Sequence, residues 1–325
     1  MHLRLLKLLT LLTTVIGTAG LAFAEKPADV PVKVFLLAGQ SNMQGQGVVD
    51  MDHPQYYNGG KGILNNVMKG PKNAARYGHI KDANGNYVVR DDVWVRYQTK
   101  HELKRRGLGI GLAGYEGLHH IGPEFQFGHV IGDQFKEPVL LIKTAWGGKS
   151  LYQDFRPPSA GGEVGPYYTQ MIKEADEALA AMGEDFPSLK GRKYELAGFV
   201  WFQGWNDMFN KDGLAEYEEN LVHLVNDVRK HFDTPKLPVI IGELGNGGPK
   251  ANENMLTIRQ AQKQAAKSFG TRGNVVFVQT SQFARPAEES PNVGHGHHWF
   301  GNAESYFLIG DALGKAMIKL VDRGN

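Results

Sequence analysis

Five short and nearly continuous apolar runs constrain the fold of this 325-residue chain more than any other feature. They are rich in Val, Ile, Leu and Phe, and none alternates cleanly between apolar and polar residues as a half-exposed strand does. The runs span Val32–Ala38, Pro138–Trp146, Leu196–Phe202, Pro238–Glu243 and Asn274–Thr280. Such runs are typical of strands in a parallel sheet that is covered on both faces.

Amphipathic stretches lie between and after these runs and predict helices. They span Pro123–Phe135, Pro166–Met182, Leu214–Phe232, Glu253–Phe269 and Asn302–Val321. Leu221, Leu224 and Val228 recur at helical spacing, and two of the stretches begin with proline, which is tolerated at a helix start. Strand and helix alternate five times, which predicts a three-layer, doubly wound α/β fold.

A long insertion from residue 44 to about residue 120 interrupts this alternation. It is rich in Gly, Asn, Asp and Tyr, with turn signals at 58–60 and 84–86. A structureless loop of this length is unusual in a compact domain, so we expect short hairpins in it, for example around Tyr87–Val95. Because the insertion follows the first strand, we expect it to lie over the active face.

The first 24 residues predict an export signal. Arg4 and Lys7 precede an apolar run, and Ala22-Phe23-Ala24 fits the small-x-small pattern that signal peptidase cleaves. The run is short for a membrane span, and an uncleaved anchor is the alternative. We therefore expect a secreted or periplasmic protein that has no contact with a membrane after cleavage of the signal.

The charge and the cysteine content of the chain exclude several classes of function. Arg4 and Lys7 account for the whole formal charge of +2, since residues 25–325 hold 34 basic and 34 acidic side chains. Nucleic acid and anionic membranes need a concentrated basic surface, so neither is an expected partner. The absence of cysteine excludes thiolate catalysis, cysteine-ligated zinc and disulfides. We expect residues 25–325 to form a single domain, large enough to be stabilised by its core.

A serine follows the first predicted strand, in Gly39-Gln40-Ser41-Asn42-Met43. Doubly wound folds carry functional residues just beyond the carboxyl ends of their strands. A serine hydroxyl becomes a nucleophile when a neighbouring base takes its proton, and a tight turn exposes backbone N–H groups to an oxyanion. The alternative is a serine that caps the next helix. The Gly-x-Ser-x-Gly elbow is absent, because Met43 replaces its second glycine.

Four blocks in order along the chain carry a resemblance to a known family. They are GQSNM at 39–43, TAWGGKS at 144–150, WFQGWND at 201–207, and His298 with Trp299. Together they resemble the sialate O-acetylesterase and acetylxylan-esterase-like carbohydrate esterases, a branch of the Ser-Gly-Asn-His (SGNH, or GDSL-type) hydrolase superfamily. The matches run from residue 34 to residue 319. The resemblance implies a flavodoxin-like sheet and a serine esterase that needs no cofactor.

The resemblance also implies a role for each matched residue. Ser41 would be the nucleophile, and His298 the general base that later protonates the leaving sugar hydroxyl. The backbone N–H groups of Ser41 and Gly148 would hold the oxyanion, together with the side-chain amide of Gln203 or of Asn206. Gln203 and Asn206 remain alternative oxyanion donors, because the third block contains both.

The acid partner of His298 is where the sequence departs from the family pattern. The usual aspartate three residues before the histidine is His295 here, and the glutamate of the Q-G-E block is Trp205. We favour Asp207 as the acid, with a helix cap as its alternative role. The other possibilities are Glu243, Glu288 or Glu289, or a dyad in which a backbone carbonyl orients the imidazole.

The remaining motifs have simpler interpretations. The histidines of the 295–298 segment lack an accompanying metal-ligand motif, so we expect no metal and no other cofactor. Glu124 follows a helix-starting proline and is expected to oppose the helix dipole. Trp205 and Trp299 are the tryptophans that we expect in a sugar-binding pocket.

These observations predict a secreted serine esterase that removes O-acetyl groups from a carbohydrate through an acyl-enzyme. Two alternatives follow from the same residues. The missing acids at 205 and 295 favour a catalytically impaired carbohydrate-binding protein on the same fold. The superfamily resemblance also allows a GDSL-type short-chain lipase or esterase, although no strongly apolar lid segment is present.

Overall fold

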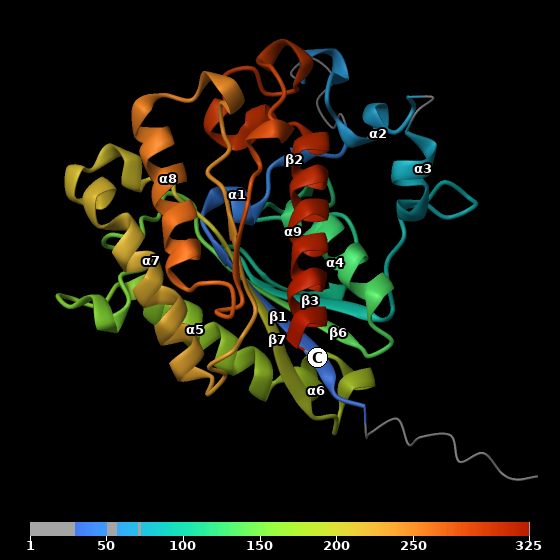
Figure 1. The fold of residues 1–325 in the computed structure, drawn as a ribbon. Helices are drawn as coiled ribbons and strands as arrows, with labels where there is room; N and C mark the ends of the chain where they lie inside the picture. Colours follow the sequence, from blue (N-terminus) through green and yellow to red (C-terminus); the bar gives the residue numbers. More distant parts are fainter. Residues whose placement is uncertain (1–29, 51–56, 71–72, 325) are drawn as a thin grey trace, which may run out of the picture.

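A computed structural model describes residues 30–50, 57–70 and 73–324 of the chain (Figure 1). The predicted export signal lies outside the described residues. A seven-stranded sheet in the order β4-β3-β6-β1-β7-β8-β9 forms the centre. Its strands are β1 (Val32–Gly39), β3 (Val93–Gln98), β4 (Leu103–Gly107), β6 (Val139–Ala145), β7 (Tyr194–Phe202), β8 (Val239–Gly242) and β9 (Val275–Val278).

The five strands that the apolar runs predict are confirmed and pair in parallel. β1 pairs with β6 on one side and with β7 on the other, and β8 and β9 continue the sheet. Numbered among themselves, these five strands follow the order 2-1-3-4-5, which is the flavodoxin-like doubly wound order. In this order the connections change direction between β1 and β7, so the carboxyl ends of these two strands border the crevice in which such folds bind ligands.

Helices cover both faces of the sheet, as the sequence predicts. They are α1 (Ser41–Gln44), α2 (Leu64–Val67), α3 (Ala74–Tyr77), α4 (Pro123–Gln134), α5 (Pro166–Ala180), α6 (Met182–Asp185), α7 (Lys211–His231), α8 (Glu253–Ser268) and α9 (Ala303–Gly324). In Figure 1, α4 and α9 lie over one face, and α5, α7 and α8 over the other. All five predicted helices are therefore present.

The central strand explains why the apolar runs are continuous. Leu36 and Ala38 of β1 belong to the core beneath α5, α7 and α8, while Phe35 and Leu37 belong to the core beneath α4 and α9. Successive strand residues point to opposite faces, and here both faces are covered, so the consecutive positions from Val34 to Ala38 are all apolar. The strand thus has no polar side that would produce an alternating pattern.

The long insertion differs from its prediction. Its hairpin is β3–β4, further along the chain than the predicted Tyr87–Val95, and it extends the sheet beyond β6. Val93 and Val95 are fully buried against the core, which accounts for this placement. A separate two-stranded ladder, β2 (Gly47–Val48) with β5 (His120–Ile121), brings the start and the end of the insertion together. Only part of the insertion therefore remains outside the central sheet.

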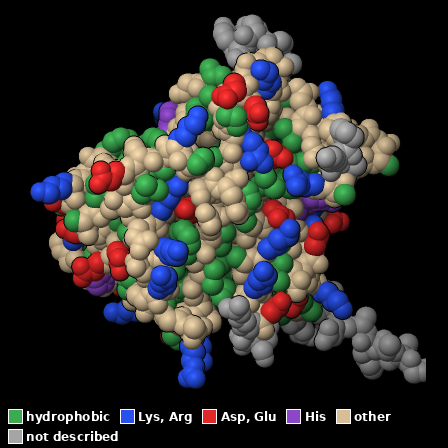
Figure 2. Space-filling model, turned by 45° about the horizontal axis from the view of Figure 1, so that its top comes forward, with side chains coloured by type: hydrophobic (Ala, Val, Ile, Leu, Met, Phe, Trp, Pro, Cys, Tyr) green, Lys and Arg blue, Asp and Glu red, His purple; other side chains and the backbone are tan. Residues whose placement is uncertain are grey.

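The carboxyl ends of the parallel strands face the upper edge of the molecule in Figure 1, and α9 runs from that edge back to the amino ends. Figure 2, in which this edge comes forward, shows Lys and Arg side chains interspersed with Asp and Glu, without a field of a single sign. Among the described residues, no helix is long and apolar enough to cross a membrane.

Candidate active site

Ser41 begins the short helix α1, directly after the central strand β1. Gly39 ends that strand against β7, and a Cβ atom on it would lie 2.2 Å from the carbonyl oxygen of Phe202. A glycine is therefore required for β1 and β7 to approach this closely at their carboxyl ends. The serine side chain is largely buried, with 7% of the residue exposed.

The residue before the serine holds the loop that follows β7. The Gln40 side-chain oxygen accepts hydrogen bonds from the backbone N–H of Gly204 (3.3 Å) and of Asn206 (3.4 Å). Its Nε2 donates to Oδ1 of Asn206 at 3.1 Å. Gln40 thus fixes the third block of sequence against the first.

The residue after the serine holds the histidine loop. Nδ2 of Asn42 donates to the carbonyl oxygen of His297 at 3.2 Å and to Oδ1 of Asn246 at 3.3 Å. Asn246, in the loop after β8, donates to the same His297 carbonyl at 2.9 Å. The Tyr306 hydroxyl of α9 donates to Oδ1 of Asn42 (2.9 Å) and to the His298 carbonyl (3.3 Å). Ser41 therefore lies between two side chains that bind opposite loops.

His298 lies in the 3-10 segment η9 (Gly296–Gly301), whose backbone is irregular. The next two residues, Trp299 and Phe300, have φ angles of 54° and 55°, in the left-handed region that side chains other than glycine rarely adopt. Burial, together with the smaller effect of the neighbouring His297 and His295, lowers the pKa of His298 to about 3. The imidazole is therefore neutral at neutral pH, as a general base must be.

Three histidines of this loop form a compact group. The ring centroids of His297 and His298 lie 4.0 Å apart, and that of His295 lies 5.6 Å from His297. The ring of Trp205 also packs against His297, at 5.8 Å between centroids. In the part of the chain that the structure describes, no three His, Cys, Asp or Glu side chains are arranged to hold a metal ion.

The second block lies close to the serine. A Cβ atom on Gly147 would lie 3.7 Å from Cβ of Ser41. Gly148 adopts a φ of 73°, and its carbonyl oxygen accepts a hydrogen bond of 2.9 Å from Nδ2 of Asn206. The N–H of Gly148 has no hydrogen-bond partner among the described residues. Gly148 and Asn206 are thus linked to each other and, through Gln40, to the serine.

Gln203, the other candidate amide, is occupied elsewhere. Its Nε2 donates to the carbonyl oxygen of Lys149 at 3.0 Å and to Asp207 at 2.6 Å. Its Oε1 accepts a hydrogen bond from the Tyr217 hydroxyl at 3.0 Å. These hydrogen bonds engage the Gln203 amide with other protein groups. The amide therefore stabilises the third block and does not face the crevice.

Asp207 has partners other than the predicted one. Its carboxylate accepts hydrogen bonds from the backbone N–H groups of Leu151 (2.9 Å) and Tyr152 (2.8 Å), and from Gln203 (2.6 Å). Both oxygens are therefore engaged, and neither bonds to His298. Burial raises the pKa of Asp207 to about 6, against the opposing effect of these hydrogen bonds. The carboxylate anchors the loop between β6 and α5, which is neither the acid nor the helix-cap role that the sequence suggests.

The other candidate acids also lack contact with the imidazole. Glu243 accepts hydrogen bonds from the backbone N–H groups of Thr280 (2.8 Å) and Ser281 (2.7 Å), and Glu288 and Glu289 are exposed. Among the described residues, no carboxylate forms a hydrogen bond or ion pair with the His298 side chain. The geometry thus corresponds to a serine and a histidine without a carboxylate partner.

A buried ion pair lies directly beneath α1. Nζ of Lys143 contacts the Glu124 carboxylate at 2.7 Å, and both side chains are fully buried. The same ammonium donates to the carbonyl oxygens of Gln44 (2.9 Å) and Leu112 (3.0 Å), while Glu124 accepts a hydrogen bond from the N–H of Gly122. The pair joins β6, α4 and the end of the nucleophile helix. Glu124 therefore does more than oppose a helix dipole.

Sequence reasoning missed Asn246, Tyr306 and Lys143. Each lies far from the serine in the chain and acts through one or two polar side-chain atoms. Nothing in one sequence distinguishes such a residue from an ordinary loop or core residue. A polar signal existed only for Lys143, which is a charged residue inside an apolar strand run.

Comparison with known proteins identifies the family of this chain. The family model "Carbohydrate esterase, sialic acid-specific acetylesterase" matches residues 31–319. The chain is also 22% identical over 235 residues to a probable carbohydrate esterase of Arabidopsis thaliana, which covers 71% of this chain and 75% of that protein.

Solved structures share the fold. An Arabidopsis thaliana protein superposes with a TM-score of 0.56 at 17% identity, covering 89% of this chain and 98% of that one. A carbohydrate acetylesterase from Xanthomonas citri gives 0.54 at 14% identity, over 90% of this chain and 57% of its own, and NanS gives 0.53 at 14% identity, over 91% and 99%. The family model covers most of the sequence, and the chain therefore belongs to the carbohydrate esterases of the sialic acid-specific acetylesterase family.

Proposed function

We propose that this protein hydrolyses O-acetyl esters of sugars through an acyl-enzyme formed on Ser41. One observation carries the proposal: the side chains of Gln40 and Asn42, on either side of the serine, bind the Asn206 loop and the His298 loop respectively. A nucleophile, its base and its oxyanion donors are thereby held by one short peptide, which is the arrangement that acyl transfer needs.

The chemistry follows the two-step pattern of serine esterases. Neutral His298 takes the proton of the Ser41 hydroxyl while Oγ of Ser41 attacks the acetyl carbonyl carbon. The tetrahedral oxyanion collapses, the ester C–O bond breaks, and His298 gives the proton to the leaving sugar oxygen. A water molecule, deprotonated by the same imidazole, then attacks the acetyl-serine. Acetate leaves, and Ser41 recovers its proton.

For the oxyanion we favour Asn206 over Gln203. The Asn206 amide is bound to Gly148 through one hydrogen bond, and the N–H of Gly148 is free of other described partners. Both donors therefore belong to one linked unit beside Ser41. The Gln203 amide, in contrast, would have to give up internal hydrogen bonds to Lys149 and Asp207.

We further propose that His298 works without a carboxylate. Its loop is fixed through backbone carbonyls, by Tyr306 at His298 and by Asn42 and Asn246 at His297. An imidazole held in this way keeps its position with no charged partner, at the cost of a weaker stabilisation of the imidazolium that forms during the reaction. The substrate class that we propose is an acetylated sugar or polysaccharide outside the cytoplasm, reached through the predicted export signal.

Replacing the nucleophile tests the mechanism. In Ser41→Ala, acetate release from p-nitrophenyl acetate and from an acetylated glycan should fall by about three orders of magnitude or more, as when a catalytic serine is removed. Undiminished release would refute the serine mechanism. A neighbouring surface change, Ser281→Ala, serves as the matched control because that side chain lies outside the proposed chemistry.

Two further measurements separate the alternative functions. The lack of a carboxylate beside His298 favours the alternative of a catalytically impaired binding protein. A fluorophosphonate should label Ser41 of an active esterase covalently, whereas an impaired binding protein would not react. A series of acyl-ester chain lengths should show a preference for acetyl. A preference for long chains would instead identify a lipase.

A further inference from the structure

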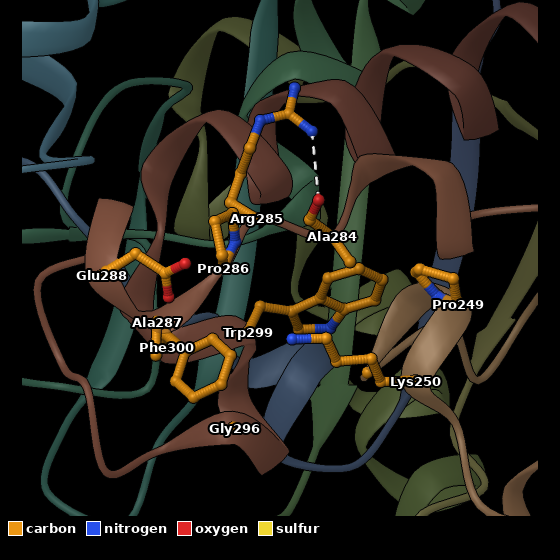
Figure 3. Close-up of a pocket in the computed structure, with 11 residues that line it drawn as sticks. Pro249, Lys250, Ala284, Arg285, Pro286, Ala287, Glu288, Gly296, Trp299 and Phe300 are labelled. Atoms are coloured by element: carbon orange, nitrogen blue, oxygen red, sulfur yellow. Dashed lines mark hydrogen bonds between the residues drawn. The ribbon is translucent and has the colours of Figure 1, made fainter.

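A cavity of about 350 Å³ is bordered by residues of the histidine loop (Figure 3). It lies between the segment after β8, the segment around 284–288 and the histidine segment η9. We call it the η9 pocket and define it by Lys250, Arg285, Glu288, Trp299 and Phe300, with proline, alanine and glycine residues completing its wall. It is much larger than the cavity of about 10 Å³ beside Gln40 and Asn42.

The pocket contains a buried donor with no acceptor. Trp299 is 2% exposed, and its indole Nε1–H has no hydrogen-bond partner among the described residues. A buried N–H without an acceptor is costly, and native proteins seldom leave one unpaired. In Figure 3 the indole lines the cavity with its nitrogen toward Lys250. A ligand with a hydroxyl or ether oxygen would supply the missing acceptor.

Charged groups of both signs border the same space. Lys250 and Glu288 are exposed, and within the described ranges neither side chain forms a hydrogen bond or an ion pair. Arg285 is already engaged, because its Nε contacts Glu304 at 2.8 Å and its guanidinium turns away from the cavity in Figure 3. The free groups are thus one cation and one anion, a pair that suits a neutral, hydroxyl-rich ligand.

The walls of the pocket are apolar and rigid. Phe300 and Trp299 both have left-handed backbone conformations, which Phe300 maintains through hydrogen bonds of its N–H to His295 and of its carbonyl to the N–H of Asn292. Strain of this kind is commonly kept at ligand sites. An aromatic wall with a few polar groups at its border is the usual construction of a sugar-binding pocket.

The pocket is lined by the chain segment that carries the proposed general base. Gly296, Trp299 and Phe300 line it, and His298 stands between them in the same six-residue segment. We infer that the η9 pocket is a subsite for a second sugar unit, next to the unit whose ester is cleaved at Ser41. This inference rests on the proposed function, and it implies that the protein prefers oligosaccharides to single acetylated sugars.

Calorimetry on the full chain tests the subsite separately from catalysis. Unacetylated xylotetraose and sialyllactose are titrated into Ser41→Ala protein and into Ser41→Ala carrying Lys250→Ala or Glu288→Gln. At least one oligosaccharide should bind, and each pocket variant should weaken that binding about fivefold, as expected for one lost hydrogen bond. Lys236→Ala is the matched control: it is also an exposed lysine beside β8, but it precedes the strand and lies at the opposite end.

Kinetics on acetylated substrates provides the second test. With acetylated xylotetraose or acetylated sialyllactose, Lys250→Ala should raise KM about fivefold with an unchanged kcat, and the KM of the matching acetylated monosaccharide should change less than twofold. Equal effects on the two substrates, or the absence of binding by both oligosaccharides, would overturn the subsite. If no ester is hydrolysed, the proposed function fails, and the calorimetric result alone then decides whether the pocket binds sugars.

Discussion

At the scale of single residues, the site depends on the two amides that flank the nucleophile. Gln40 and Asn42 are each close enough to Ser41 to be fixed by the same turn, and each reaches a loop more than 160 positions away in the chain. A change in either loop therefore acts on the serine through one hydrogen-bonded side chain. The Ser41 peptide is the common support of both halves of the site.

The pKa of His298 determines one prediction at this scale. Burial places the pKa at about 3 in the folded protein, so the imidazole stays neutral and competent as a base down to about pH 4. The acidic limb of a kcat/KM profile for p-nitrophenyl acetate should therefore lie below pH 5. A limb near pH 6.5, the ordinary value for histidine, would show that the imidazole is not desolvated as described.

Asp207 gives a second prediction, which concerns the pH dependence of stability. Its direction is opposite to that of a carboxylate whose pKa is lowered by an ion pair. The pKa of Asp207 is about 6 when folded and 3.8 ordinarily, so the folded state binds more protons between these values. Stability should therefore decrease as the pH rises from about 4 to 6, by up to about 3 kcal/mol. Asp207→Asn should flatten this dependence in urea titrations at several pH values, while Asp91→Asn, at an exposed carboxylate, should leave it unchanged. An unaltered profile in Asp207→Asn would contradict the assignment.

At the scale of elements, the buried ion pair ties β6 and α4 to the nucleophile helix. Lys143→Met leaves Glu124 as a buried charge with no counter-ion, and this should reduce the free energy of unfolding by about 3–5 kcal/mol. The double variant Lys143→Met with Glu124→Gln should recover part of the loss, because no uncompensated charge remains.

Urea denaturation measures both effects, and an exposed ion pair supplies the control. Lys315→Met breaks the pair with Asp311 on the surface of α9, which should cost less than about 1 kcal/mol. If Lys143→Met loses no more stability than this control, the buried pair does not hold the elements together.

The sequence predicted the strands and helices well because both faces of the sheet are covered. The search for continuous apolar runs did not find the hairpin β3–β4, because its outer strand carries Lys104, Arg105 and Arg106. Charged edge strands prevent sheets from aggregating, and they do not resemble apolar runs. The positions of the first three blocks could be predicted together with the strands, because each block lies at the carboxyl end of an apolar run, at β1, β6 or β7.

Partners that meet only through the fold were not predictable. Asn246, through its amide, and Tyr306, through its hydroxyl, contact both the histidine loop and Asn42, and neither belongs to a recognisable block. Asp207 is favoured as the acid because it is close in sequence to the candidate oxyanion amides, but its carboxylate bonds to a different loop. Contacts of this kind depend on the position of the backbone, which one sequence does not specify.

At the scale of the whole molecule, residues 25–325 have no net charge, and the surface in Figure 2 mixes both signs. The protein therefore has no net charge that would attract a charged substrate over a long range. We expect kcat/KM for a neutral acetylated sugar to change less than about twofold between 50 and 500 mM salt, measured by acetate release. A steep decrease with salt would instead indicate an anionic substrate drawn by a local basic group.

The course of α9 has a practical consequence. The helix starts beside the histidine loop and ends near the amino ends of the strands, so its last turn lies at the edge of the sheet opposite to Ser41 (Figure 1). Protein immobilised on a bead through a tag after α9 would point its crevice outward into the solvent. A large polysaccharide, which cannot enter the space between the protein and the bead, could then still reach the serine. The carboxyl-terminal end of α9 is therefore a suitable place for attachment.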